Sequence, residues 1–121
     1  MEFHPTDHVY ECIPPVLGID KSTDPVVIGL KVVTVAEMDA EVLAGRGLTP
    51  EKVSERTMAL VKSKFAFVRN LTIGGQEVTT FEDFYSKAPP ELVRWVCNAV
   101  YSTQILSAAE RKNSSPGSGS D

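Results

Sequence analysis

Histidine and cysteine side chains near the start of the sequence have a spacing that could hold a metal ion. His4, His8 and Cys12 follow one another at intervals of four residues. On a helix this spacing would align the three side chains, and imidazole and thiolate groups are ligands of zinc. Pro5 argues against a helix, and on an extended chain the same side chains would share one strand face. Three ligands in a terminal segment make a weak motif, so we expect no metal to be bound.

A cysteine nucleophile is the second chemistry to consider. Cys97 would need an imidazole beside it, but both histidines of the sequence, His4 and His8, lie near the first residues. At helical spacing within an apolar stripe, Cys97 is more typical of a small buried hydrophobe. The sequence has no Ser/His/Asp order, no paired-carboxylate motif and no Gly-Lys-Ser/Thr phosphate loop. We therefore expect neither an enzyme nor a cofactor.

The composition argues against other classes of function. The 121 residues include 12 Lys and Arg against 16 Asp and Glu, which does not favour binding to nucleic acid. Basic and acidic residues alternate between Lys52 and Arg94, as on a solvated mixed surface. The sequence lacks the apolar run of a signal peptide and the roughly 18 apolar residues of a membrane span. We expect a single soluble, cytosolic domain in which Cys12 and Cys97 are reduced thiols.

The predicted secondary structure changes from strands to helices after Val33. Val9–Ile13 and Val26–Val33 are rich in β-branched residues, and turn residues and prolines separate them, which predicts two antiparallel strands. From Thr34 onward the apolar spacing is helical, so the fold class is α+β. We predict an N-terminal β unit, a mainly helical portion of the same domain and a disordered Gly/Ser/Pro-rich tail, at residues 1–33, 34–113 and 114–121.

Capping residues predict where the helices begin. Thr34 with Glu37 forms a capping-box pattern, Thr49 precedes Pro50, and Thr80 precedes a short helix. The helix after Thr49 is predicted to run for about five turns. Its amphipathic stripe consists of Val53, Thr57, Leu60, Val61, Lys64, Phe65 and Val68.

The C-terminal half is predicted to contain one tight turn and one further long helix. The turn falls at Gly74–Gly75, between short strand-like flanks. The helix begins after the prolines at positions 89 and 90, and Ser107 would cap a short helix beyond it. The stripe of the long helix consists of Leu92, Trp95, Val96, Ala99, Val100, Thr103 and Leu106.

Aromatic residues are dense between Phe65 and Tyr101, and most of them are expected in the core. Phe65 and Phe67 would lie about 200° apart on a helix, so one of them would face away from that core. Exposed aromatic side chains mark interaction surfaces. The candidate partner-binding residues are Phe67, Phe84, Tyr85 and Trp95, with the alternative that all four belong to the core.

Three segments give the chain a resemblance to a known family. They are Val26–Glu37, in which a strand runs into a capped helix, Leu92–Val100 and Leu106–Asn113. Together with the order of elements over residues 8–113, they resemble the tail assembly chaperones of long-tailed bacteriophages. The resemblance implies a non-catalytic protein in the cytoplasm of the bacterial host. Such a protein binds the tape measure protein, keeps it from aggregating and helps the tail tube polymerise around it.

The same resemblance implies a second, longer product. The family makes it by ribosomal frameshifting near the end of the short reading frame, and the extension recruits tail tube subunits. Here Lys112-Asn113 could be encoded AAA-AAC, which forms a slippery heptamer if the Arg111 codon ends in A. Several identical copies could also line one long client, so a homo-oligomer is expected.

Two other classes of function stay open. One is a different small adaptor or regulator that binds another protein. The other is an enzyme that uses Cys97 or the group His4, His8 and Cys12. Alanine at Cys97, His4 or His8 would abolish function in an enzyme, whereas a chaperone would show only effects on stability.

Overall fold

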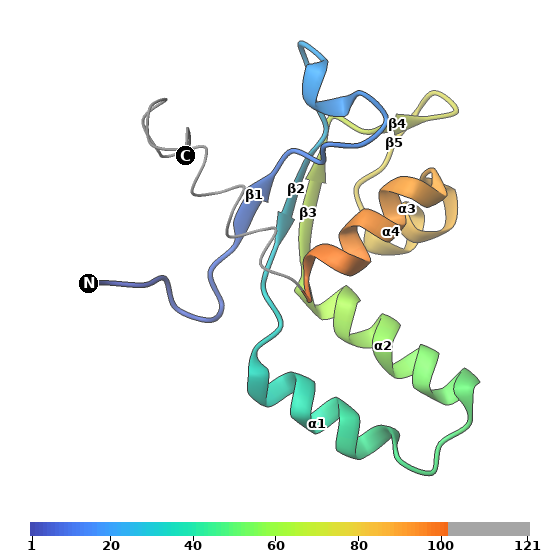
Figure 1. The fold of residues 1–121 in the computed structure, drawn as a ribbon. Coiled ribbons are helices and arrows are strands. Elements are labelled where there is room, and N and C mark those ends of the chain that lie inside the picture. Colours follow the sequence, from blue (N-terminus) through green and yellow to red (C-terminus); the bar gives the residue numbers. More distant parts are fainter. Residues whose placement is uncertain (102–121) are drawn as a thin grey trace.

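The computed structural model describes residues 1–101 of the chain, and it confirms the predicted α+β class (Figure 1). Two antiparallel sheets and four helices make up this part of the chain. The strands are β1 (Tyr10–Cys12), β2 (Val27–Leu30), β3 (Phe65–Arg69), β4 (Thr72–Ile73) and β5 (Gln76–Glu77). The helices are α1 (Val35–Gly45), α2 (Pro50–Lys64), α3 (Phe81–Lys87) and α4 (Pro90–Ala99), and a 3-10 turn covers Ile19–Lys21.

The larger sheet has the strand order β1-β2-β3, with antiparallel pairs throughout. Cys12 of β1 and Val68 of β3 both lie opposite Ile28 of the central strand. The smaller sheet is the predicted hairpin of β4 and β5. Its turn residues Gly74 and Gly75 both have positive φ, at 59° and 81°. Glycine adopts this conformation without steric cost, as two-residue hairpin turns require.

The sequence predicts that helix α2 extends as far as Val68, and this prediction is wrong. The helix ends at Lys64, and the next five residues form β3, which pairs with β2. Helical spacing and strand propensity compete in this segment, because aromatic and β-branched residues favour a pleated sheet. Pairing with β2 decides the outcome, since it buries Val68 opposite Ile28. The third strand of the sheet therefore comes from within the portion predicted to be mainly helical.

A β-bulge in β3 puts Phe65 and Phe67 on opposite faces of the sheet. Phe67 lies opposite Gly29 and Phe65 opposite Leu30, so Ala66 is the extra residue and is exposed. The Phe65 ring lies on the core face, 5.2 Å from the Phe84 ring centroid. On the outer face the Phe67 ring covers Gly29, where any Cβ atom would collide with it. Phe65 and Phe67 therefore face in different directions, as expected. The cause is a bulged strand, whereas the sequence predicted a helix.

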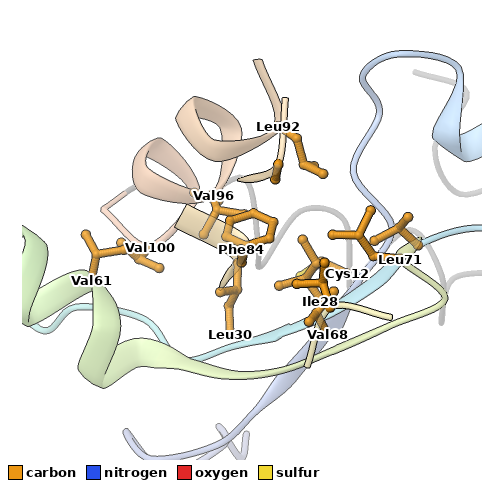
Figure 2. Packing of buried hydrophobic residues seen from close by; sticks show 14 of the residues in the cluster. Cys12, Ile28, Leu30, Val61, Val68, Leu71, Phe84, Leu92, Val96 and Val100 are labelled. Carbon is orange, nitrogen blue, oxygen red and sulfur yellow. The ribbon is translucent and has the colours of Figure 1, made fainter. Parts of the chain in front are cut away.

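The hydrophobic core lies between the larger sheet and helices α3 and α4. Figure 2 shows Phe84 of α3 between Val96 of α4 and Leu30 of β2, and none of the three has any exposed surface. Val61 of α2 and Val100 extend the same cluster (Figure 2). Only the C-terminal half of α2 is therefore anchored in the core, because residues 50–56 are all exposed.

Helix α4 is shorter than the predicted stripe. It ends at Ala99, and the backbone N–H of Val33 donates to the carbonyl oxygen of Val100 at 2.9 Å. The predicted continuation through Thr103 and Leu106, the short helix after Ser107 and the tail lie outside the described residues. Within residues 1–101, no helix is both long and apolar enough to cross a membrane.

Candidate functional site

Helices α1 and α2 form a hairpin that extends beyond the end of the larger sheet (Figure 1). The predicted caps are present at both helix starts. The Thr34 hydroxyl accepts from the Glu37 N–H at 3.1 Å, and the Glu37 carboxylate accepts from the Thr34 N–H at 2.9 Å. The Thr49 hydroxyl accepts from the Lys52 N–H at 3.3 Å, with Pro50 in the first turn. Local sequence thus fixes where each arm of the hairpin begins.

Two ion pairs hold the arms of the hairpin together. Arg56 of α2 donates two hydrogen bonds to the carboxylate of Glu41 in α1, at 3.2 and 2.9 Å. Lys64 of α2 approaches both carboxylate oxygens of Glu37 in α1, at 2.8 and 2.7 Å. The Lys64 side chain is only 12% exposed, so this second pair is the better shielded from solvent. The relative position of α1 and α2 is therefore set by charge as well as by packing.

The Lys64 ammonium also tunes the acidity of Glu37. Its hydrogen bond to the carboxylate lowers the pKa of Glu37 below the ordinary 4.5, and the Thr34 backbone N–H lowers it further. A carboxyl whose pKa is depressed by folding stabilises the folded state above its unfolded pKa. That contribution is lost as the pH falls through the folded pKa, so the hairpin should weaken in acid below about pH 4.5.

We expect the variant Glu37→Gln to be less stable than the parent at pH 7 by up to about 1 kcal/mol, since the Glu37 side chain is 36% exposed and solvent screens part of the attraction. Glutamine keeps the hydrogen bond to Thr34 but removes the charge that faces Lys64. The difference in free energy of unfolding, measured by urea titration, should shrink as the pH is lowered from 7 to 3. A difference that stays constant over this range would contradict the role of the Glu37 charge.

Helix α1 carries apolar side chains that the core does not cover. Among the described residues, no side chain of α1 is fully buried. Val35, Val42 and Leu43 are 69%, 64% and 61% exposed. On α2, Val53 is 40% exposed. Such a concentration of exposed apolar side chains on one hairpin is typical of an interaction surface.

A groove of about 480 Å³ runs along this hairpin. We call it the hairpin groove, and its lining is mostly apolar. The lining residues are Met38, Glu41, Val42 and Gly45 of α1, Val53 and Thr57 of α2, and Tyr101. Among its polar side chains, Glu41 pairs with Arg56 and the Thr57 hydroxyl donates to the Val53 carbonyl oxygen at 3.0 Å. The hairpin groove is therefore suited to apolar side chains.

Tyr101 belongs to the lining of the hairpin groove. Burial raises the pKa of its hydroxyl, and the negative charge of Glu41 raises it further. The tyrosine is therefore a neutral hydroxyl at neutral pH, as a wall of an apolar groove requires.

The four predicted partner-binding residues do not form one surface. Phe84 has no exposed surface, and Trp95 packs against the core as a half-buried side chain. Phe67 lies on the outer face of the sheet, with the Arg69 guanidinium 4.8 Å from its ring centroid. Tyr85 is 51% exposed and stacks on Phe81 at a centroid distance of 5.9 Å. Tyr85 keeps the most surface for a partner, and Phe84 offers none in this fold.

The residues considered for catalysis and metal binding were Cys97 and the group His4, His8 and Cys12. Burial raises the pKa of the Cys97 thiol, which disfavours the reactive thiolate. The rings of His4 and His8 stack at 3.8 Å, and Cys12 is 2% exposed with its Sγ 3.6 Å from the Tyr10 carbonyl oxygen. In residues 1–101, no group of three or more His, Cys, Asp or Glu side chains could hold a metal ion.

The hairpin groove was not predicted from the sequence, although a signal was present. Helix α1 has four large apolar side chains in 11 residues, whereas the first turns of α2 are almost entirely polar. A polar partner helix cannot cover that much apolar surface, so part of α1 had to remain exposed. Comparisons of the chain with protein-family models, with curated proteins and with solved structures found no match.

Proposed function

We propose that the protein is a tail assembly chaperone of a long-tailed bacteriophage and acts in the cytoplasm of the bacterial host. Its client would be the tape measure protein, which it keeps from aggregating while the tail tube polymerises. Its role is binding and not catalysis. The proposal begins from the resemblance carried by Val26–Glu37, Leu92–Val100 and Leu106–Asn113. A longer frameshift product would recruit the tail tube protein, and several copies would line one client.

The observation that supports this function most strongly is the apolar surface of the α1–α2 hairpin. A chaperone for a helical client needs apolar side chains held on a rigid support, into which the apolar face of the client can dock. The hairpin groove supplies Met38, Val42 and Val53 for that contact. The anchored end of α2 and the pair between Lys64 and Glu37 supply the support.

The charges of the hairpin are compatible with reversible binding. Glu41 and Arg56 form their ion pair at the groove, so neither has to leave solvent without a counter-charge when an apolar helix docks. The chain as a whole has a formal net charge of −4, which opposes self-association while apolar surface is exposed. The same surface can therefore bind a client without making the protein itself aggregate.

Co-expression with the tape measure protein of the same phage tests the proposal. We expect the parent chain to raise the amount of soluble tape measure protein and to co-purify with it. Val42→Asp should weaken that association by at least about tenfold, because a docked client would bury an unpaired carboxylate. Unchanged solubility of the tape measure protein with and without the parent chain would contradict the chaperone function.

Leu43→Asp is the matched control for Val42→Asp. The two side chains are adjacent on α1 and are almost equally exposed, at 64% and 61%, but only Val42 lines the described groove. Leu43→Asp should therefore bind the client like the parent. If both variants lose the client equally, the hairpin groove is not the docking surface, and a general loss of apolar surface would explain the result.

A further inference from the structure

We propose that the solvent-facing side of helix α1 packs against the same helix of a second copy of this chain, antiparallel and about a two-fold axis beside Leu43. We call this surface the outer face of α1, and it consists of Val35, Ala36, Asp39, Ala40 and Leu43, all exposed. The proposed function places several copies on one client but does not say where they touch. This inference goes beyond it, because the contact needs no client.

The distribution of side chains around α1 is the first argument. Helix α2 and the hairpin groove lie along one side of α1, whereas Val35 and Leu43 on the outer face are 69% and 61% exposed (Figure 1). Of the three charged side chains of α1, Glu37 and Glu41 form ion pairs with α2, which leaves only Asp39 on the outer face. A surface helix normally presents a polar face to water, and one that is apolar all round is buried. The outer face therefore favours a partner of its own.

The charges near the outer face indicate that this partner is a second copy. Asp39 lies within the outer face, and Arg46 follows the last turn of α1, with both residues exposed. Within residues 1–101, neither side chain forms an ion pair. In an antiparallel pair whose two-fold axis lies midway between positions 39 and 46, each Arg46 lies opposite Asp39 of the other copy. Two ion pairs then form at once, so the surface is self-complementary, as a two-fold contact requires.

The register set by these ion pairs also suits the apolar side chains. The axis lies beside Leu43, so the two Leu43 side chains meet at the centre of the contact. The small side chain of Ala40 next to them lets the two helix axes approach to about 8–10 Å. The two Asp39 carboxylates remain about 10 Å apart along the helix axis, which is close to the Debye length at physiological salt. Their mutual repulsion is therefore largely screened.

The size of the contact indicates that the dimer is weak. Helix α1 has 11 residues and is about 16 Å long. Two helices of this length bury less than the about 1,200–2,000 Å² of a standard interface, and the net charge of −4 on each copy opposes their approach. We expect a dissociation constant above about 1 µM. The contact is then populated where copies are held close together, as they would be along one client.

Charge exchange in the full chain without client tests this contact. Sedimentation equilibrium from low micromolar to near millimolar concentration should show a monomer–dimer equilibrium for the parent. Arg46→Glu and Asp39→Arg should each weaken the dimer by at least about fivefold, because each places like charges opposite one another. The double variant Asp39→Arg with Arg46→Glu should recover the affinity of the parent, because the two ion pairs re-form with their signs exchanged.

Two comparisons separate this contact from an effect of net charge. Arg94→Glu makes the same change of charge at an exposed position of α4 and should dimerise like the parent. Asp39→Arg makes the chain less negative, so net charge alone would strengthen its association, whereas the proposed contact weakens it. A parent chain that stays monomeric throughout, a dimer insensitive to both single variants, or a double variant no better than the single ones would overturn the proposal.

Disulfide trapping locates the two-fold axis independently. Leu43→Cys in a Cys97→Ala background should give a disulfide-linked dimer on a non-reducing gel after oxidation, since the two thiols lie beside the axis. Ala36→Cys in the same background is the control, because in this register its two copies lie about 20 Å apart along the helix axis. Equal yields of dimer at the two positions would overturn the register.

None of these measurements contains a client, so their failure is distinguishable from failure of the chaperone function. The client tests with Leu43→Asp are made below the dissociation constant of the dimer, where this variant and the parent are both monomers. Loss of the dimer with retention of the client would then assign the outer face and the hairpin groove to different partners.

Discussion

Replacing Phe84 with alanine is expected to lower the free energy of unfolding by about 3–5 kcal/mol. Phe84 has no exposed surface, and its ring lies 5.2 Å from the Phe65 ring and 6.5 Å from the Phe81 ring. The substitution would leave a cavity where the sheet, α3 and α4 meet, and the backbone can fill it only in part. Because domains of this size are stable by only about 5–15 kcal/mol, a large share of the stability would be lost.

Tyr85→Ala is the matched control for Phe84→Ala. Both residues are aromatic neighbours on α3, but Tyr85 is 51% exposed. Urea unfolding followed by circular dichroism should show a change for Tyr85→Ala of less than about 1 kcal/mol, since only its stacking on Phe81 is lost. Similar losses for both variants would contradict the orientation of α3 on the sheet.

Placing a carboxylate at Val68 is expected to cause the second largest loss in the free energy of unfolding. Val68 is 7% exposed and lies opposite Ile28 in the central strand. In Val68→Asp the aspartate would be buried without a counter-charge, which costs more than about 3 kcal/mol and raises the pKa of the new carboxyl. We expect most of the protein to be unfolded or aggregated at 37 °C, as measured by thermal unfolding and size-exclusion chromatography.

Ala66→Asp provides the control within the same strand and tests the β-bulge directly. In a regular ladder Ala66 would lie opposite Leu30 in the core, whereas the bulge leaves it exposed and brings Phe65 to that position. With the bulge, Ala66→Asp should change the free energy of unfolding by less than about 0.5 kcal/mol. A loss as large as that of Val68→Asp would rule the bulge out.

The local features of the fold could be predicted because they depend on neighbouring residues. Thr34 with Glu37, Thr49 with Pro50, and Thr80 cap three helices as expected, since each cap needs only groups within one helical turn. The turn at Gly74–Gly75 follows from two adjacent glycines that accept positive φ. The change from strands β1 and β2 to helices α1 and α2 follows from the change of apolar period after Val33.

The features that could not be predicted depend on partners far away in the sequence. The segment Phe65–Arg69 has a spacing compatible with a helix, and only its pairing with β2 makes it a strand. The partner-binding prediction for Phe84 considered the side chain without the sheet that buries it. No local pattern reports such contacts, because burial is a property of the assembled tertiary structure.

The sequence by itself determined the fold class, the helix starts and the absence of a recognisable catalytic motif, because these are properties of residue types and short spacings. Only the tertiary structure decided which apolar residues remain uncovered. Val61 lies in the core, whereas Val42 and Val53, which have the same side chain, line the hairpin groove. The physical reason is that the core anchors only the C-terminal half of α2, so the rest of the hairpin keeps its apolar surface available for a partner.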